Sequence, residues 1–390
     1  MKKLNLSGKT GIFIAAIISI LLVVIGAFIF KTEPVKTSDS ELETATVTSV
    51  IAETTQNGIN GNEVITVIFE AKITSGSEKG KSFKMTQTLD DMTPPVPKKV
   101  QSGDKILVGR TNTDQTLSTV SEWAYAGVIN LVPVIILILF FLLLILLIGG
   151  FKGVTTILAL VITVATIFFI YIPSVLQGYN IYASTIIISL FIILSSLIIL
   201  NGFNKKTLCA IVGNAGGLLI SGLLALLINE IFGITGIVDQ DYLFLTMLEG
   251  GVSIDLKALI WGGMLIGSLG AVMDVSMSLA SPMQELYLEM ENPTFARLVR
   301  SGFNIGKDSI GTMANTLILA YVGSSFATIL LFAAYNSSLI ILLNFEMILV
   351  EIIQAVVGSI GILLSVPITV FFSAFIQMRS GAKKDKLQQN

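Results

Sequence analysis

Long apolar runs dominate the pattern of hydrophobic and polar positions along the chain. A membrane-spanning helix needs roughly 20 mostly apolar residues on all its faces. The runs that meet this length lie at 11–30, 123–148, 154–172, 181–200, 208–232, 256–280, 309–335 and 346–378. The pattern therefore predicts an α-helical polytopic membrane bundle of about eight transmembrane helices.

The composition supports a membrane protein and narrows its chemistry. The chain is 53% hydrophobic and only 13% charged, and its mean hydropathy of +0.84 is above that of soluble globular proteins. Histidine is absent and Cys209 is the only cysteine, which removes the usual zinc ligands, disulfides and histidine-based acid–base catalysis. We expect no enzyme activity, no cofactor, no metal and no nucleic-acid partner, with the lipid bilayer as the surroundings.

One segment, 31–122, has the pattern of a small soluble β domain. After a polar linker, the stretches TATVTSVI, EVITVIFEAKI, KSFKMTQTL and KILVG alternate in the manner of strands. Turn signals rich in Gly, Asn and Ser separate them. The spacing predicts an OB-like barrel or sandwich, between an anchor at 1–30 and a seven-helix bundle at 123–378.

The distribution of basic residues predicts the orientation. With the N-terminus in the cytoplasm, Lys152, Lys205, Lys206, the 297–307 segment and the basic tail at 379–390 all fall on the cytoplasmic side. Both termini are then cytoplasmic in the cell membrane, and the β domain is extracytoplasmic. The first run has no cleavage site of small residues behind it, so we interpret it as an uncleaved anchor.

The sixth run carries a stripe of small and polar residues that includes an acid. Gly263, Gly267, Gly270, Asp274 and Ser278 recur at helical spacing on one face. Small residues at this spacing let two helices pack closely, which is the structural interpretation. A lone carboxylate in hydrocarbon costs about 2.5–3.5 kcal/mol even on the insertion scale, and desolvation favours its protonated form. Asp274 therefore suits a proton or ion carrier.

Three other runs have similar stripes. Those in the last two runs add acids and amides, and with the fifth run they could enclose a hydrated path or form a tightly packed bundle. The candidates for the path are Asp274, Ser278, Asp308, Thr312, Asn315 and Glu351. The candidates for helix packing are Gly263, Gly267, Gly270, Gly213, Gly217, Gly358 and Gly361.

The cytoplasmic link at 281–308 contains the pattern of a helix start. Ser281, Pro282 and Gln284 match an N-cap, a first-turn proline and a capping-box partner. The pattern predicts a separate short helix that carries Glu285. This glutamate either pairs with Arg297 or Arg300, or it belongs to a solvated acidic face.

Two long motifs resemble a known family. The stretch GAVMDVSMSLASPMQEL at 270–286 is followed by RSGFNIGKDSIGTMANTLILAYVGSS at 300–325. Together they resemble the signature of the YibE/F-like membrane proteins, which implies a multi-pass protein of a family regarded as permeases. A fainter, fold-level likeness is to proton-driven export subunits of the SecD/SecF type.

Two functions follow from these observations. The first is a secondary transporter or permease, with Asp274 as carrier and energy from an ion gradient or a partner subunit, since no ATP-binding motif is present. The second is a non-transporting accessory protein that recruits partners through its outer domain and cytoplasmic link. The sequence leaves the substrate open, and it leaves open whether the chain forms a homo-oligomer or joins a partner membrane subunit.

Overall fold

A computed structural model describes residues 6–31, 42–57, 63–76, 78–90, 98–110, 123–247, 253–335 and 338–388. These residues form two compact units. One unit is Pro34–Leu144, and the other joins Met1–Glu33 to Ile145–Asn390.

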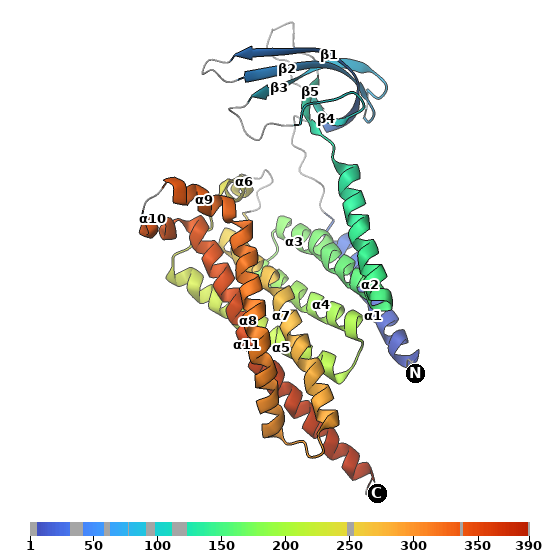
Figure 1. Ribbon diagram of the computed structural model, residues 1–390, viewed down its shortest axis with the longest axis vertical. Helices are drawn as coiled ribbons and strands as arrows, with labels where there is room; N and C mark the ends of the chain where they lie inside the picture. The colour runs from blue at the N-terminus through green and yellow to red at the C-terminus, as the bar shows by residue number, and fades with distance from the viewer. Residues whose placement is uncertain are drawn as a thin grey trace. The chain divides into compact units, whose positions relative to one another are not determined.

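The smaller unit contains a five-stranded antiparallel sheet with the strand order β3-β2-β1-β4-β5. Its two edge strands, β3 and β5, approach each other, so the sheet curls into a half-barrel (Figure 1). The strands are β1 (Leu42–Asn57), β2 (Glu63–Ile73), β3 (Ser82–Asp90), β4 (Lys105–Arg110) and β5 (Trp123–Val128). Alternate side chains such as Val67, Phe69 and Ala71 fill the core, as period-two alternation requires. Five strands are also the number in an OB-like barrel.

The fifth strand corrects the predicted start of the second apolar run. Residues 123–128 form β5, whose Trp123 is buried and pairs with Arg110 of β4. The following helix begins only at Leu131. Because β5 and α2 are both apolar, hydropathy shows no break between them, and the predicted run covers both elements.

The larger unit is helical. Its helix α2 begins in the smaller unit and crosses the boundary between the two. The helices are α1 (Leu6–Ile29), α2 (Leu131–Thr166), the π-helix η1 (Ile167–Tyr171), α3 (Ile172–Leu176), α4 (Ile181–Asn201), α5 (Lys205–Ile231), α6 (Gln240–Thr246), α7 (Leu256–Glu289), α8 (Phe295–Ser324), α9 (Phe326–Tyr335), α10 (Leu339–Asn344) and α11 (Glu346–Gln388).

Six helical segments among the described residues are long and apolar enough to cross a membrane, and the number is seven if the bent pair α8 and α9 is one span. The predicted count of eight is not confirmed. Two places account for the difference: the bent pair α8 and α9, and Leu131–Leu176, which counts as one segment of 46 residues. Within it the backbone leaves the helical region at Gly150 (φ 53°, ψ −128°). A Cβ atom on Gly153 would overlap the carbonyl oxygen of Ile145, so the chain turns sharply here.

The centre of the bundle is a group of three helices, α5, α7 and α11, which all contact one another. Helix α8 packs against α7 and α11, and α4 packs against α5 and α7 and also contacts α1 (Figure 1). Buried leucine, isoleucine, valine and methionine side chains join these helices into contiguous clusters. The arrangement leaves one side of α7 between α4 and α8.

Helix α7 continues through the predicted link, so the separate helix expected to start at Ser281 is wrong. Pro282 lies inside α7, which ends at Glu289. Proline removes one backbone hydrogen bond and strains the preceding turn. Met283, the next residue, is fully buried in the cluster that α7 shares with α8 and α11, and this packing holds the last turns in the helix.

Candidate functional site

The stripe of small and polar residues on α7 is open in this structure. Gly263, Gly267, Gly270 and Asp274 are exposed, and Ser278 is half-buried. On one flank, side chains of α7 pack into the cluster that includes α4, and on the other flank they pack into the cluster that includes α8. The stripe therefore faces outward between these two contacts.

The surroundings of the glycines separate open positions from packed ones. At Gly263 and Gly270, an added Cβ atom would meet no other atom within 4 Å. At Gly267 it would overlap the hydroxyl of Tyr321 from α8. Helix packing within this chain thus explains Gly267, whereas Gly263 and Gly270 have no close neighbour among the described residues.

Four glycines of α5 and α11 have close neighbours of their own. An added Cβ on Gly213 would overlap Thr369, and one on Gly217 would lie 2.8 Å from the carbonyl oxygen of Gly361. On Gly361 it would lie 3.1 Å from Ser221 Cβ, and on Gly358 it would lie 2.8 Å from Leu317. Contacts under 3.0 Å require a shift of the neighbour, so Gly213 and Gly217 need glycine for close helix approach, whereas the contacts at Gly358 and Gly361 are tight but leave the neighbour room to adjust.

Exposed polar residues of α8 continue the stripe of α7. Asp308, Thr312 and Asn315 are exposed. The two helices run antiparallel, because a Cβ on Gly302 would lie 2.7 Å from Met283 Sδ and one on Gly306 would lie 3.6 Å from Leu279. This register brings Thr312 to the level of Asp274 and Asp308 to the level of Ser278.

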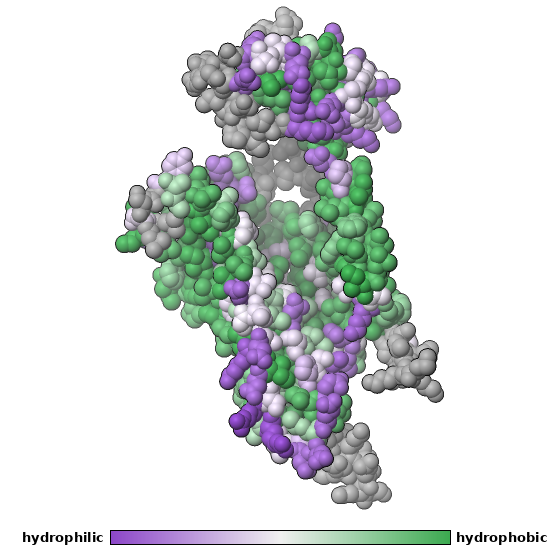
Figure 2. Space-filling view, viewed as in Figure 1, coloured by the Kyte–Doolittle hydropathy of each residue, from purple (hydrophilic) through white to green (hydrophobic). Residues whose placement is uncertain are grey.

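We call this surface the polar face. It comprises Gly263, Gly267, Gly270, Asp274 and Ser278 of α7 and Asp308, Thr312 and Asn315 of α8. Figure 2 shows pale and purple residues where Figure 1 places the lower parts of α7 and α8.

Asp274 is the acidic residue of the α7 stripe, and it is exposed. It makes no hydrogen bond or ion pair with any other residue in the described part of the chain. The neighbouring serines Ser276 and Ser278 donate to carbonyl oxygens of their own helix instead. Such a carboxylate can accept a proton or contact a cation from the open side.

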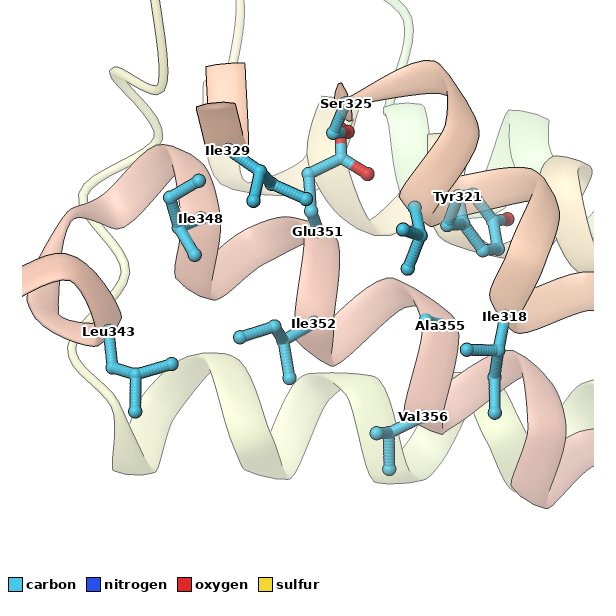
Figure 3. A pocket seen from close by; sticks show the side chains of 11 residues that line it. Ile318, Tyr321, Ser325, Ile329, Leu343, Ile348, Glu351, Ile352, Ala355 and Val356 are labelled. Atoms are coloured by element: carbon cyan, nitrogen blue, oxygen red, sulfur yellow. The ribbon is translucent and has the colours of Figure 1, made fainter. Parts of the chain in front are cut away.

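Glu351 lies apart from the polar face, in a pocket near the N-terminal end of α11. Its Oε2 atom is buried and accepts no hydrogen bond from the part of the chain that the structure describes. The pocket has a volume of about 280 Å³ and is lined by α8, α9, α10 and α11, with Tyr321 and Ser325 as the other polar residues (Figure 3). Sequence reasoning missed these two residues. The only signal was a tyrosine and a serine near the end of an apolar run.

The charged residues predicted for the cytoplasmic link remain apart. Glu285 is exposed near the end of α7, and Arg297 and Arg300 are exposed in the first turns of α8. Among the residues that the structure describes, none of the three takes part in an ion pair. No cluster of three metal-ligating side chains occurs in these described ranges either.

Comparison with known proteins identifies the family. Residues 137–379, more than half of the chain, match the family model of the YibE/F-like proteins. The chain belongs to the YibE/F-like family. The matched region includes the polar face and the Glu351 pocket, and it begins after the five strands of the half-barrel.

The other comparisons give the YibE/F-like chain no closer relative. No curated protein and no solved structure matches it. The fainter likeness to SecD/SecF-type export subunits is therefore not supported.

Proposed function

We propose that this YibE/F-like protein is a secondary transporter in which Asp274 carries a proton or another cation. The observation that supports the proposal most directly is the exposure of Asp274, Gly263 and Gly270 on a helix long and apolar enough to span a membrane. A polar surface at bilayer depth is tolerated only where it meets water or protein. The polar face therefore lines either a hydrated path or an interface.

The proposed topology has eight crossings with both termini in the cytoplasm. Support comes from the turn at Gly150, which separates the apolar stretch at 131–149 from the one that ends at 176. Each stretch is long enough for one crossing. Lys152 then lies on the cytoplasmic side, in agreement with the positive-inside rule, and the half-barrel lies outside.

One specific observation favours the second candidate, an accessory protein with a bound partner. Gly263 and Gly270 are exposed on one face of α7, and no atom of the described residues lies within 4 Å of a Cβ added to either, which is the open space that small residues offer to a second helix. A second copy or a partner subunit on the polar face would fill this space. The two candidates differ in whether water reaches Asp274.

Cysteine labelling decides between them. The only native cysteine, Cys209, is buried, and a Cys209→Ala background makes each introduced thiol the single target. Gly270→Cys should react with a membrane-impermeant maleimide in inside-out vesicles or intact cells, because the side chain would project into open space. The control is Leu223→Cys on α5, which is 63% exposed but on an apolar surface that faces lipid, and it should stay unlabelled.

Equal protection of both positions would contradict the transport proposal. It would mean that lipid or a protein partner covers the polar face, and crosslinking of Gly270→Cys to a second copy would then identify an interface.

A second experiment tests the carrier role without a known substrate. In reconstituted membranes on a solid support, a step in external pH should produce a transient charge displacement when Asp274 takes up protons. Asp274→Asn should abolish this current and Asp274→Glu should retain it. Glu230→Gln, at an exposed acid near the end of α5, is the control that should leave the current unchanged. An unchanged current in Asp274→Asn would reject the carrier role.

A further inference from the structure

The pocket around Glu351 combines apolar walls with a single acidic side chain. Isoleucine, leucine and valine side chains from α8, α9, α10 and α11 form its walls. Figure 3 shows these apolar groups along most of the pocket, with the Glu351 carboxylate directed toward the end occupied by Ser325. The ring of Tyr321 borders the same region. The pocket thus has one acidic end and a long apolar remainder.

Glu351 is half-buried, and one oxygen of its carboxylate is buried without a partner among the described residues. A buried polar atom costs free energy unless it is hydrogen-bonded or paired with a charge. Its Oε2 atom has no hydrogen-bond partner, and Glu351 takes part in no ion pair with a described residue. A positively charged ligand would supply the missing partner.

The end of the bundle that holds the pocket is acidic. Glu346, Asp239, Asp241 and Asp255 lie on or beside the first turns of α11, α6 and α7, and Glu346 accepts hydrogen bonds from the backbone of Thr235 (2.9 Å) and Gly236 (2.8 Å). Lys257 is the basic residue among the described positions of this region. The resulting negative potential attracts cations and repels anions.

We propose that this pocket binds an amphipathic organic cation, such as a hydrophobic amine or quaternary ammonium compound. The ammonium group would lie at the Glu351 carboxylate and against the Tyr321 ring, whose face attracts cations, and the hydrocarbon part would fill the apolar walls. A small metal ion does not fit this site, because Mg²⁺ and Ca²⁺ require several oxygen ligands and the walls offer none.

The site is separate from the polar face, and ligand binding here does not depend on the transport proposal. One side chain nevertheless contacts both sites, because Tyr321 lines the pocket and its hydroxyl lies next to Gly267 of the polar face. A binding measurement that involves no transport tests the pocket alone.

The experiment measures binding of benzyltrimethylammonium to the full chain in lipid nanodiscs, by equilibrium dialysis against empty nanodiscs. The matched ligand control is neopentylbenzene, which has the same shape without the charge. Glu351→Gln keeps the size of the side chain and should weaken binding of the cation by about tenfold or more, because the charge partner is lost. Glu351→Asp should retain binding of the cation over its isostere.

Two further variants separate charge recognition from general effects. Glu230→Gln removes an exposed acid outside the pocket and should leave binding unchanged. Ala355→Phe fills the pocket and should abolish binding of the cation. If Glu351→Gln binds the cation as well as the unmodified chain does, the proposal is wrong. It is equally wrong if the isostere binds as tightly as the cation, since the pocket then does not recognise the positive charge.

Discussion

At the scale of single residues, two kinds of glycine occur in spanning helices of the same bundle. Gly213 on α5 lies directly against Thr369 on α11, whereas Gly270 on α7 has no atom near the position of a Cβ. Glycine destabilises a helix interior by roughly 0.5–1 kcal/mol relative to alanine. The presence of each glycine in a helix therefore requires a structural explanation, and the explanation differs between Gly213 and Gly270.

Substitution by alanine should change the free energy of unfolding in opposite directions at Gly213 and Gly270. Gly213→Ala forces Thr369 aside and should lower the free energy of unfolding by about 1–3 kcal/mol, the usual range for an overpacked site. Gly270→Ala should leave it unchanged or raise it by up to about 1 kcal/mol. Helix content during unfolding in mixed detergent micelles measures both. A Gly270→Ala variant as unstable as Gly213→Ala would show that the polar face is packed in the purified protein.

A second residue-scale prediction concerns Glu78 in the half-barrel. The indole of Trp123 donates a hydrogen bond to its carboxylate (3.1 Å), and with the positive charges of Lys81 and Arg110 it holds the pKa of Glu78 below the ordinary 4.5. Because the folded-state pKa is depressed, this stabilisation is complete above pH 4.5 and is lost as the pH falls through the folded value.

Fluorescence of Trp123 reports this titration. The chain has two tryptophans, so Trp261→Phe leaves Trp123 alone. Its emission should change in a step below pH 4.5, and Glu78→Gln should remove the step. Persistence of the step in the Glu78→Gln variant would assign it to another carboxylate.

At the scale of elements, hydropathy was a good guide to which segments are helical and a poor guide to where they begin and end. Every predicted apolar run contains a helix. The errors occur where two elements are equally apolar, as β5 and α2 are, or where tertiary packing overrides a local signal. Pro282 is of the second kind, since burial of Met283 keeps the helix intact around it.

The turn at Gly150 makes an element-scale prediction. Its backbone combines a positive φ of 53° with a ψ of −128°, a region that only glycine adopts without strain. Gly150→Ala should therefore lower the free energy of unfolding by about 1–3 kcal/mol. Gly149→Ala is the matched control, because its Cβ would meet no atom within 4 Å and its φ is not positive. Equal stability of the two variants would indicate a straight helix through this position.

At the scale of the whole molecule, the number of crossings fixes the side of the C-terminus. An even number of crossings, such as six or eight, places both termini on the same side of the membrane, and seven place them on opposite sides. A C-terminal fluorescent-protein fusion should fluoresce and a C-terminal alkaline phosphatase fusion should be inactive, because each reporter works on one side only. A phosphatase fused after residue 130 should be active as the control. An active C-terminal phosphatase would support seven crossings.

The candidate site shows why sequence reasoning stops before the assembled bundle. Helical spacing identified the stripe through Asp274, because one helix is enough to define a face. It did not indicate whether that face is covered, since coverage depends on where α4 and α8 pack. The Glu351 pocket was beyond reach for the same reason, because Tyr321 and Glu351 come from helices that meet only in the folded chain.

The close fit of α5 to α11 limits which helices can move. Gly213, Gly217 and Gly361 mesh with side chains and backbone of the opposite helix along several turns, so sliding one helix past the other would create overlaps at all of these places at once. The pair therefore acts as the fixed frame of the bundle. If Asp274 carries a cation as proposed, the opening and closing around it would fall to the helices beside α7, with α4 and α8 as the moving walls and α5 with α11 as the stationary one.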